Sequence, residues 1–472
     1  MRPLFLPALL VLASPAAAAD VWFRIENDSG DMVGWQHEQQ VEDAGGTRRL
    51  RDTVMAYRVV GHEPTRSHFR IEQRRDAAGR LRMLTIESGD GRRSATRRVT
   101  IGGTDAVVDD GKGRILHRFA VPAGLDFRDG DALLPIERDA GAGEIAFDLA
   151  PGDLRPMEVR TEERAIDDAG KPRTAVVVYQ GDRVAHAWFV ERDGTGRIVA
   201  ADQPLFGTRL HFRRVSKPVD AADLAGTASL PHQMRASPYY VAPGALRGHI
   251  RHGFAAASGI RIRLPETGEQ AVREADGTLR VDICRDCGPG LSTDPADLDR
   301  WRRPSRWLQS DAPELVRAAA PVARSTAPDV DRMERLGRIA RQRLADVDYE
   351  GHHSALAAWR RRSGDCTEDA VLLAALARAA GIPARVANGL VYSRTRYHGA
   401  SNAFIAHSWV VAYVDGSWRS FDISTGAFDA THIALTVDDG DLAAIVAANQ
   451  TAALLEWREM AEVRKRPDRG GP

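Results

Sequence analysis

A cysteine, Cys366, stands at the expected first turn of a helix. Residues 367–380 are rich in Ala and Leu, and Gly381 with Pro383 just beyond marks a helix end. A helix N-terminus carries a partial positive charge and unpaired N–H groups, so it favours a thiolate over a thiol and can hold an oxyanion. An isolated cysteine in this position is more often a small buried residue, so the surrounding motifs must decide whether Cys366 is a nucleophile.

A histidine and an aspartate follow on two expected strands. His407 opens the strand at 408–414, Asp422 lies on the strand at 418–423, and an Asp-Gly turn at 415–416 joins the two. Adjacent antiparallel strands can set a carboxylate beside an imidazole, as a base oriented by a third group requires. Each residue alone has a common structural explanation. Their ordered combination with Cys366 indicates nucleophilic catalysis.

Four sequence blocks occur in order around these residues: Gly364-Asp365-Cys366-Thr367-Glu368, Gly381-Ile382-Pro383-Ala384-Arg385, His407-Ser408-Trp409 and Phe421-Asp422. With these blocks, residues 291–440 resemble the core of bacterial transglutaminase-like proteins, which are papain-like cysteine enzymes. The resemblance implies Cys366 as nucleophile, His407 as general base and acid, and Asp422 as the group that orients the imidazole. It also implies an amide substrate in a protein or peptide. Acyl transfer to an amine and hydrolysis, as by a protease or amidase, remain open, because both pass through the same thioester.

The alternative is a non-catalytic binding or assembly protein of the cell envelope, in which the same fold serves only as a scaffold. Retention of all three catalytic residue types argues against it. We therefore expect a cysteine-dependent acyltransferase or amide hydrolase.

The elements that must position these residues fall into three expected regions. Residues 20–216 read as short strands separated by turn signals such as the Asp-Gly pairs at 110 and 193, which predicts an antiparallel meander or sandwich. Residues 217–290 form a smaller β module, with strands expected at 259–264 and 279–283 from their alternating apolar positions. The predicted fold is thus multidomain, with β-rich N-terminal modules before an α+β papain-like or transglutaminase-like domain at 291–472.

Within the last region, helices precede an antiparallel sheet. Asp329 is the expected cap of one helix, and the helix at 367–380 follows it. Strands are expected at 385–392, 408–414, 418–423 and 432–437, and a final helix at about 442–463.

Only three cysteines are present, so a disulfide scaffold is excluded. Cys284 and Cys287 are close enough for a local disulfide, and two plain thiols are the other possibility. A zinc site would need a second close pair, which the sequence lacks. The acidic residues at 438–441 lack the ligand pattern of a calcium loop. We therefore predict no metal and no cofactor.

Length and charge set the remaining limits. The chain has 472 residues, which suggests two or three domains, and equal numbers of basic and acidic residues, 65 each, so nothing in its charge indicates a nucleic-acid partner. Residues 1–19 combine Arg2, a short apolar run and small residues before Asp20, which is typical of a secretory signal. No later stretch reaches the length of a membrane-spanning helix. We expect an exported periplasmic or extracellular protein without an integral membrane segment.

Overall fold

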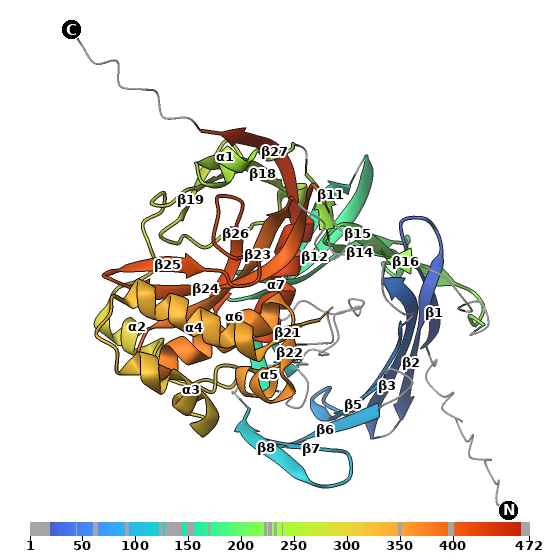
Figure 1. The fold of residues 1–472 in the computed structure, drawn as a ribbon. Helices are drawn as coiled ribbons and strands as arrows, with labels where there is room; N and C mark the ends of the chain where they lie inside the picture. Colours follow the sequence, from blue (N-terminus) through green and yellow to red (C-terminus); the bar gives the residue numbers. More distant parts are fainter. Residues whose placement is uncertain are drawn as a thin grey trace, which may run out of the picture.

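The structure is a computed structural model, and Figure 1 shows its ribbon. It describes residues 19–43, 45–59, 65–89, 94–121, 126–127, 144–148, 155–168, 170–220, 224, 229–230, 234–237, 239–347, 352–394 and 401–463. The expected signal segment lies outside these residues, except for its last position. None of the helices in these ranges is long and apolar enough to cross a membrane.

The N-terminal region is one large, almost entirely antiparallel sheet of 16 strands, as the turn signals predicted. Its strands are β1 (Ala19–Glu26), β2 (Met32–Asp43), β3 (Gly46–Val59), β4 (Thr65–Asp76), β5 (Leu81–Gly89), β6 (Ser94–Gly102), β7 (Asp105–Asp109), β8 (Ile115–Ala120), β9 (Asp126–Phe127), β10 (Glu144–Asp148), β11 (Arg155–Asp168), β12 (Lys171–Gln180), β13 (Arg183–Arg192), β14 (Ile198–Leu205), β15 (Thr208–Val215) and β16 (Ser229–Leu230). Consecutive strands pair as a meander, and β1 joins its two halves by pairing with both β2 and β15. Strands β13 and β14 pack on helix α7 (Leu442–Leu454), whereas the half with β1–β8, blue to cyan in Figure 1, forms a curved arc.

The remaining region is mixed α+β. Its central sheet has the order β17 (Met234–Ala236), β24 (Ala403–Val414), β23 (Ala384–Ser393) and β26 (Ile433–Asp438), and β25 (Ser417–Phe421) also pairs with β24. A second sheet has the order β19 (Gln270–Ala275), β20 (Thr278–Ile283), β18 (Ile250–Ala256) and β27 (Leu455–Glu462). The other elements of this region before α6 are α1 (Pro243–Leu246), a 3-10 turn at Ala257–Gly259, α2 (Pro295–Arg300), α3 (Pro313–Ala323), α4 (Asp329–Arg343), β21 (Ala345–Asp346), α5 (Ala355–Arg361) and β22 (Ser363–Gly364).

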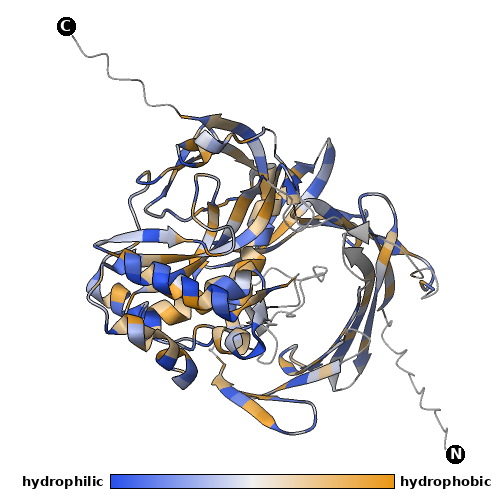
Figure 2. Ribbon diagram, in the orientation of Figure 1, coloured by the Kyte–Doolittle hydropathy of each residue, from blue (hydrophilic) through white to orange (hydrophobic). Residues whose placement is uncertain are grey.

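Helix α6 (Cys366–Ala379) is the centre of this region. Every residue from Ala370 to Arg378 is buried, because α3, α4 and α5 pack around one side of the helix and β23 and β24 around the other. A helix that is buried on all sides can be apolar all round, which its Ala and Leu content allows. In Figure 2 the strands of the central sheet are mainly orange, whereas α3 and α4 carry hydrophilic residues on their outer faces.

The final helix and the stretch at 259–264 differ from the sequence-based expectations. The final helix ends at Leu454 and not near residue 463, because β27 follows it and pairs with β18. The expected strand at 259–264 is wrong as a strand, although its burial pattern is right: Ile260, Ile262 and Leu264 are buried, but this stretch of the described chain has no strand partner.

The sheets also cross the expected boundary near residue 290. Strand β17 precedes that boundary and pairs with β24, and β27 from the C-terminal end completes the sheet of β18–β20. Residues 217–290 are therefore joined by backbone hydrogen bonds to the region that carries Cys366.

Candidate active site

The N-terminus of α6 is held by a capping box around Cys366. The side chain of Asp365 accepts from the backbone N–H of Thr367 at 2.8 Å, and Glu368 accepts from the backbone N–H of Asp365 at 3.1 Å. These bonds start the helix at Cys366. The N–H of a first helical residue has no acceptor within the helix, so it is available to a developing oxyanion.

His407 lies where one edge of β24 is left unpaired by its neighbours. On that edge β17 pairs with Ala403–Ile405 and β25 with Val410–Val414, so His407 falls between them. The expectation that His407 begins its strand is wrong, because β24 already starts at Ala403.

The imidazole of His407 is oriented by Asp422. Its Nε2 lies 2.8 Å from Oδ2 of Asp422, and both side chains are buried. Asp422 follows the end of β25 directly and is not part of the strand, contrary to expectation. The other nitrogen, Nδ1, is buried and has no hydrogen-bond partner among the described residues. The ring is thus fixed on one side and free to exchange a proton on the other.

Cys366 lies against the same strand. The backbone N–H of Ser408, the residue after His407, faces the Cys366 sulfur, and Asp422 is close enough to act on the thiol electrostatically. Cys366 is partly exposed and is the one free cysteine. The three residues named from the sequence therefore come together from α6, β24 and the end of β25.

The electrostatics of the thiol differ from what the helix terminus alone suggests. Burial and then the negative charge of Asp365, with smaller contributions from Asp422 and Asp369, raise the pKa of the Cys366 thiol, and the Ser408 N–H lowers it only in part. The expectation of a resting thiolate is therefore not supported. The raised pKa favours the thiol over the thiolate at rest, so a base must take its proton during attack.

The nearby carboxyl groups are also perturbed. Burial and the charge of Glu368 raise the pKa of Asp365 to about 7. Burial raises the pKa of Asp369 to about 6, although the hydroxyl of Ser424 donates to it at 2.8 Å. Burial also acts to raise the pKa of Asp422, but the charges and hydrogen bonds of two histidines hold it well below its usual range. Asp422 is the carboxylate that stays ionised.

The second of those histidines, His432, was not singled out by sequence reasoning. It stands one residue before β26, and its Nε2 lies 3.0 Å from Oδ2 of Asp422. No spacing in the sequence signals this contact. A local signal did exist for the turn after Asp422, because Asp422 Oδ1 accepts from the N–H of Ser424 at 2.9 Å, two residues on, as Asp residues often do in turns.

Among the residues that the structure describes, two groups of side chains have the composition of metal ligands. The ligand atoms of His407, Asp422 and His432 lie within 4.8 Å of one another. Both Nε2 atoms point at one carboxylate oxygen at hydrogen-bond distance, so we assign this group to hydrogen bonding.

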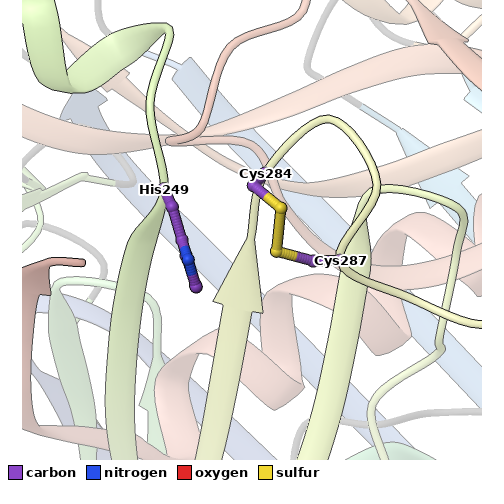
Figure 3. A group of neighbouring side chains, drawn as sticks. All are labelled: His249, Cys284 and Cys287. Atoms are coloured by element: carbon purple, nitrogen blue, oxygen red, sulfur yellow. A yellow bond between two sulfur atoms is a disulfide. The ribbon is translucent and has the colours of Figure 1, made fainter. Parts of the chain in front are cut away.

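The second group is His249 with Cys284 and Cys287, shown in Figure 3. The two sulfurs are joined in a disulfide, which decides between the two alternatives that the sequence left open. His249 lies beside the bridge, and its Nε2 is 2.6 Å from a carboxylate oxygen of Asp282. Both sulfurs are therefore engaged in a covalent bond and are not available to a metal.

Comparison with known proteins places a family domain over the site. Residues 319–423 match the model of the Transglutaminase-like superfamily, and all three residues of the site lie within that match. The chain thus contains a transglutaminase-like domain, as its sequence blocks predicted. No curated protein matches the chain.

Three solved structures are similar in part. A "putative cysteine protease" from Cytophaga hutchinsonii is 18% identical over 46% of this chain and 90% of its own, with a TM-score of 0.29. A β-barrel-like protein from Brucella abortus is 9% identical over 42% of this chain and 95% of its own, with a TM-score of 0.30. A "putative protease" from Parabacteroides distasonis is 12% identical over 77% of this chain and 69% of its own, with a TM-score of 0.20. At these TM-scores we base no argument on the three.

Proposed function

Taking residues 319–423 as a transglutaminase-like domain, we propose that this chain is an exported cysteine enzyme that acts on amide bonds of a protein or peptide through a thioester. One observation carries the proposal. The imidazole of His407 is held at Nε2 by Asp422, and its Nδ1 is buried and free beside the strand residue whose N–H faces the Cys366 thiol. This is the arrangement that a base-activated nucleophile needs.

The chemistry then runs in two halves. As the sulfur of Cys366 bonds to the substrate carbonyl carbon, its proton passes to Nδ1 of His407, and the carbonyl oxygen becomes an oxyanion at the N-terminus of α6. When the C–N bond breaks, the departing amine takes that proton from His407, and a thioester remains on Cys366. A primary amine or a water molecule then attacks the thioester carbonyl carbon and gives a proton to His407. The C–S bond breaks, the sulfur takes that proton, and an amide or a carboxylic acid leaves, which restores the Cys366 thiol.

The experiment uses the mature full-length chain with a peptide library in the presence and absence of a primary amine. Wild-type protein should form a mass adduct on Cys366 and release either an amine-linked or a hydrolysed product. Cys366→Ala should give neither and should stay folded by circular dichroism, because the substitution removes one small group. A folded Cys366→Ala protein with full turnover would disprove the cysteine mechanism.

The scaffold alternative keeps one observation in its favour, namely the raised pKa of the Cys366 thiol. Alkylation by iodoacetamide across pH separates the two functions. Selective modification of Cys366 supports catalysis, and an inert thiol at every pH supports the scaffold.

Export is part of the proposal and rests on residues 1–19. We expect the secreted protein to begin at Asp20. Intact mass of the protein recovered from periplasm or medium tests this, and an uncleaved chain retained in the cytoplasm would contradict it.

A further inference from the structure

Two imidazoles lie at hydrogen-bond distance from the same carboxylate oxygen of Asp422. Nε2 of His407 lies 2.8 Å and Nε2 of His432 lies 3.0 Å from Oδ2, to which the hydroxyl of Thr425 also donates. The N–H of Ser424 donates to Oδ1 at 2.9 Å. Orienting His407 needs only one imidazole on Asp422, so the second, fully buried one requires its own explanation.

The opposite side of His432 meets a second carboxylate. Its Nδ1 lies 3.1 Å from Oδ1 of Asp429 and 3.1 Å from the carbonyl oxygen of Asp429. Carboxylates and carbonyls only accept hydrogen bonds, so an imidazole that serves both sides must carry a proton on each nitrogen. The backbone N–H of Asp429 lies 3.2 Å from the same nitrogen, and donation from it would instead require a neutral ring.

We propose that His432 is a positioning residue that acts through Asp422: as an imidazolium it holds the shared carboxylate in place and offsets part of the negative charge that this carboxylate presents to the imidazole of His407. This inference rests on the proposed function.

The charges around His432 agree with this role. Burial lowers the pKa of His432, but its hydrogen bonds to Asp422 and Asp429 and their charges outweigh the burial and raise it to about 9. His407 on β24 is a further titratable neighbour, with ring centroids 5.9 Å apart, and the carboxyl groups of Asp369 on α6 and Asp422 act on each other electrostatically. The remaining ring contacts are aromatic, with Trp409 at 5.1 Å and Phe428 at 4.9 Å.

Loss of the His432 charge has a definite direction. Asp422 and Asp429 would then present two negative charges to the site with no buried cation between them. An additional uncompensated carboxylate stabilises the protonated form of a nearby imidazole. His407 should therefore remain protonated to higher pH, and its positive charge should in turn stabilise the thiolate of Cys366.

The test uses the full-length chain with isotope-labelled histidine, and NMR to follow each ring through pH. His432→Gln keeps an amide N–H that can reach Asp422 but removes the charge. In the wild type we expect the His432 ring to be doubly protonated at pH 7. In His432→Gln we expect His407 to titrate roughly one to two pH units higher, the size expected when a charge about 6 Å away is removed.

His252→Gln is the matched control, because His252 is also fully buried and lies on β18, outside the hydrogen bonds of Asp422. It should leave the titration of His407 unchanged. Asp429→Asn is the second variant in case His432→Gln fails to fold. It keeps His432 but removes one of its two carboxylates, so His432 should lose its second proton at lower pH.

The results separate this inference from the proposed function. A neutral His432 at pH 7, or a His407 titration that is the same in wild type and His432→Gln, overturns the inference even if the wild type turns over amides. Absence of amide turnover and of Cys366 alkylation in the wild type overturns the proposed function and leaves the NMR result to stand alone. Where both hold, His432→Gln should be alkylated several-fold faster than the wild type at pH 6–7.

Discussion

Three carboxyl groups act on the Cys366 thiol. Asp365, Asp369 and Asp422 each act to raise the pKa of the thiol, in addition to its burial. These negative charges keep the fraction of preformed Cys366 thiolate small at neutral pH. Proton removal by His407 during attack therefore becomes the step on which activity depends.

For this reason, substitutions of His407 and of Asp422 should lower amide turnover by different factors. His407→Ala removes the proton acceptor and should lower amide turnover by roughly 10²- to 10⁴-fold. Asp422→Ala should lower it less, because Asp422 touches the imidazole and not the substrate. Turnover of the two purified, folded variants checks the order. A larger loss for Asp422→Ala would show that Asp422 does more than orient the ring.

The raised pKa of Asp369 predicts that the free energy of unfolding depends on pH. Its pKa is raised from 3.8 to about 6, so the folded state keeps the proton to higher pH than the unfolded state does. The cost of charging Asp369 is absent below about pH 4, grows towards pH 6 and is constant above. Asp369→Asn removes this cost and can still accept from Ser424.

We expect Asp369→Asn to be more stable than the wild type by roughly 2–3 kcal/mol at pH 8, and equal to it near pH 4. Urea unfolding at both pH values measures the free energies. Asp276→Asn, in an exposed turn, is the control and should change neither. An equal gain at pH 4 and pH 8 would mean that the effect of Asp369→Asn is not electrostatic.

At the scale of elements, the start of α6 combines a cap with a buried charge. Asp365 accepts from Thr367 N–H and thereby caps the helix, yet its pKa is raised to about 7 by burial and by Glu368. The two effects oppose each other at neutral pH. Substitutions that remove the charge with and without the cap measure the two contributions separately.

Asp365→Asn keeps a cap acceptor and removes the charge, whereas Asp365→Ala removes both. At pH 8 we expect Asp365→Asn to be at least as stable as the wild type, and Asp365→Ala to be about 1 kcal/mol less stable than Asp365→Asn. Thermal and urea unfolding of the three proteins give these differences. Equal stability of the Ala and Asn variants would show that the cap at Asp365 contributes nothing.

The disulfide loop braces the strand that leads to Asp422. Arg419 on β25 donates to the carbonyl of Arg285 at 2.6 Å and pairs with Asp286 at 2.6 Å, both between Cys284 and Cys287. Replacing both cysteines by Ser should lower the free energy of unfolding by about 2 kcal/mol, the chain-entropy value for so short a loop. Alkylation of Cys366 should be unchanged. A slower alkylation would mean that the bridge also positions the site.

At the scale of the whole molecule, the N-terminal sheet and the α+β region share one core. Val177 and Phe189 of the sheet belong to the same buried cluster as Phe254 and Ile433 of the α+β region. Gln450 of α7 adds polar links, accepting from the N–H of Ala187 at 3.2 Å and donating to the carbonyl of Pro204 at 3.2 Å. The two regions should therefore unfold together.

Gln450→Ala leaves those two buried backbone groups without their side-chain partner. We expect a loss of roughly 1–3 kcal/mol in the free energy of unfolding, within a single transition seen by both fluorescence and circular dichroism. Cys366 alkylation in the folded variant should match that of the wild type. Two separate transitions in the wild type would contradict the shared core.

Several features of this protein could be predicted from short stretches of sequence. The start of α6 at Asp365, its end at Gly381 and the turn at Asp415 with Gly416 depend on capping and on left-handed backbone, which neighbouring residues decide. The order of thiol, imidazole and carboxylate along the chain is likewise a sequence property. It was enough to name Cys366 and its two partners.

Other features were decided only by the tertiary structure, because they depend on groups far apart in sequence. Leu455 begins a strand and does not continue α7, since the edge of β18 is there to pair with it. The raised pKa of the Cys366 thiol depends first on its burial and then on the adjacent Asp365, with a smaller contribution from Asp422. The burial and the approach of Asp422 are not contained in any local pattern around the cysteine. The contact of His432 with Asp422 forms because β26 pairs with β23. This pairing brings a second imidazole to the carboxylate of Asp422, for which the sequence had indicated only His407.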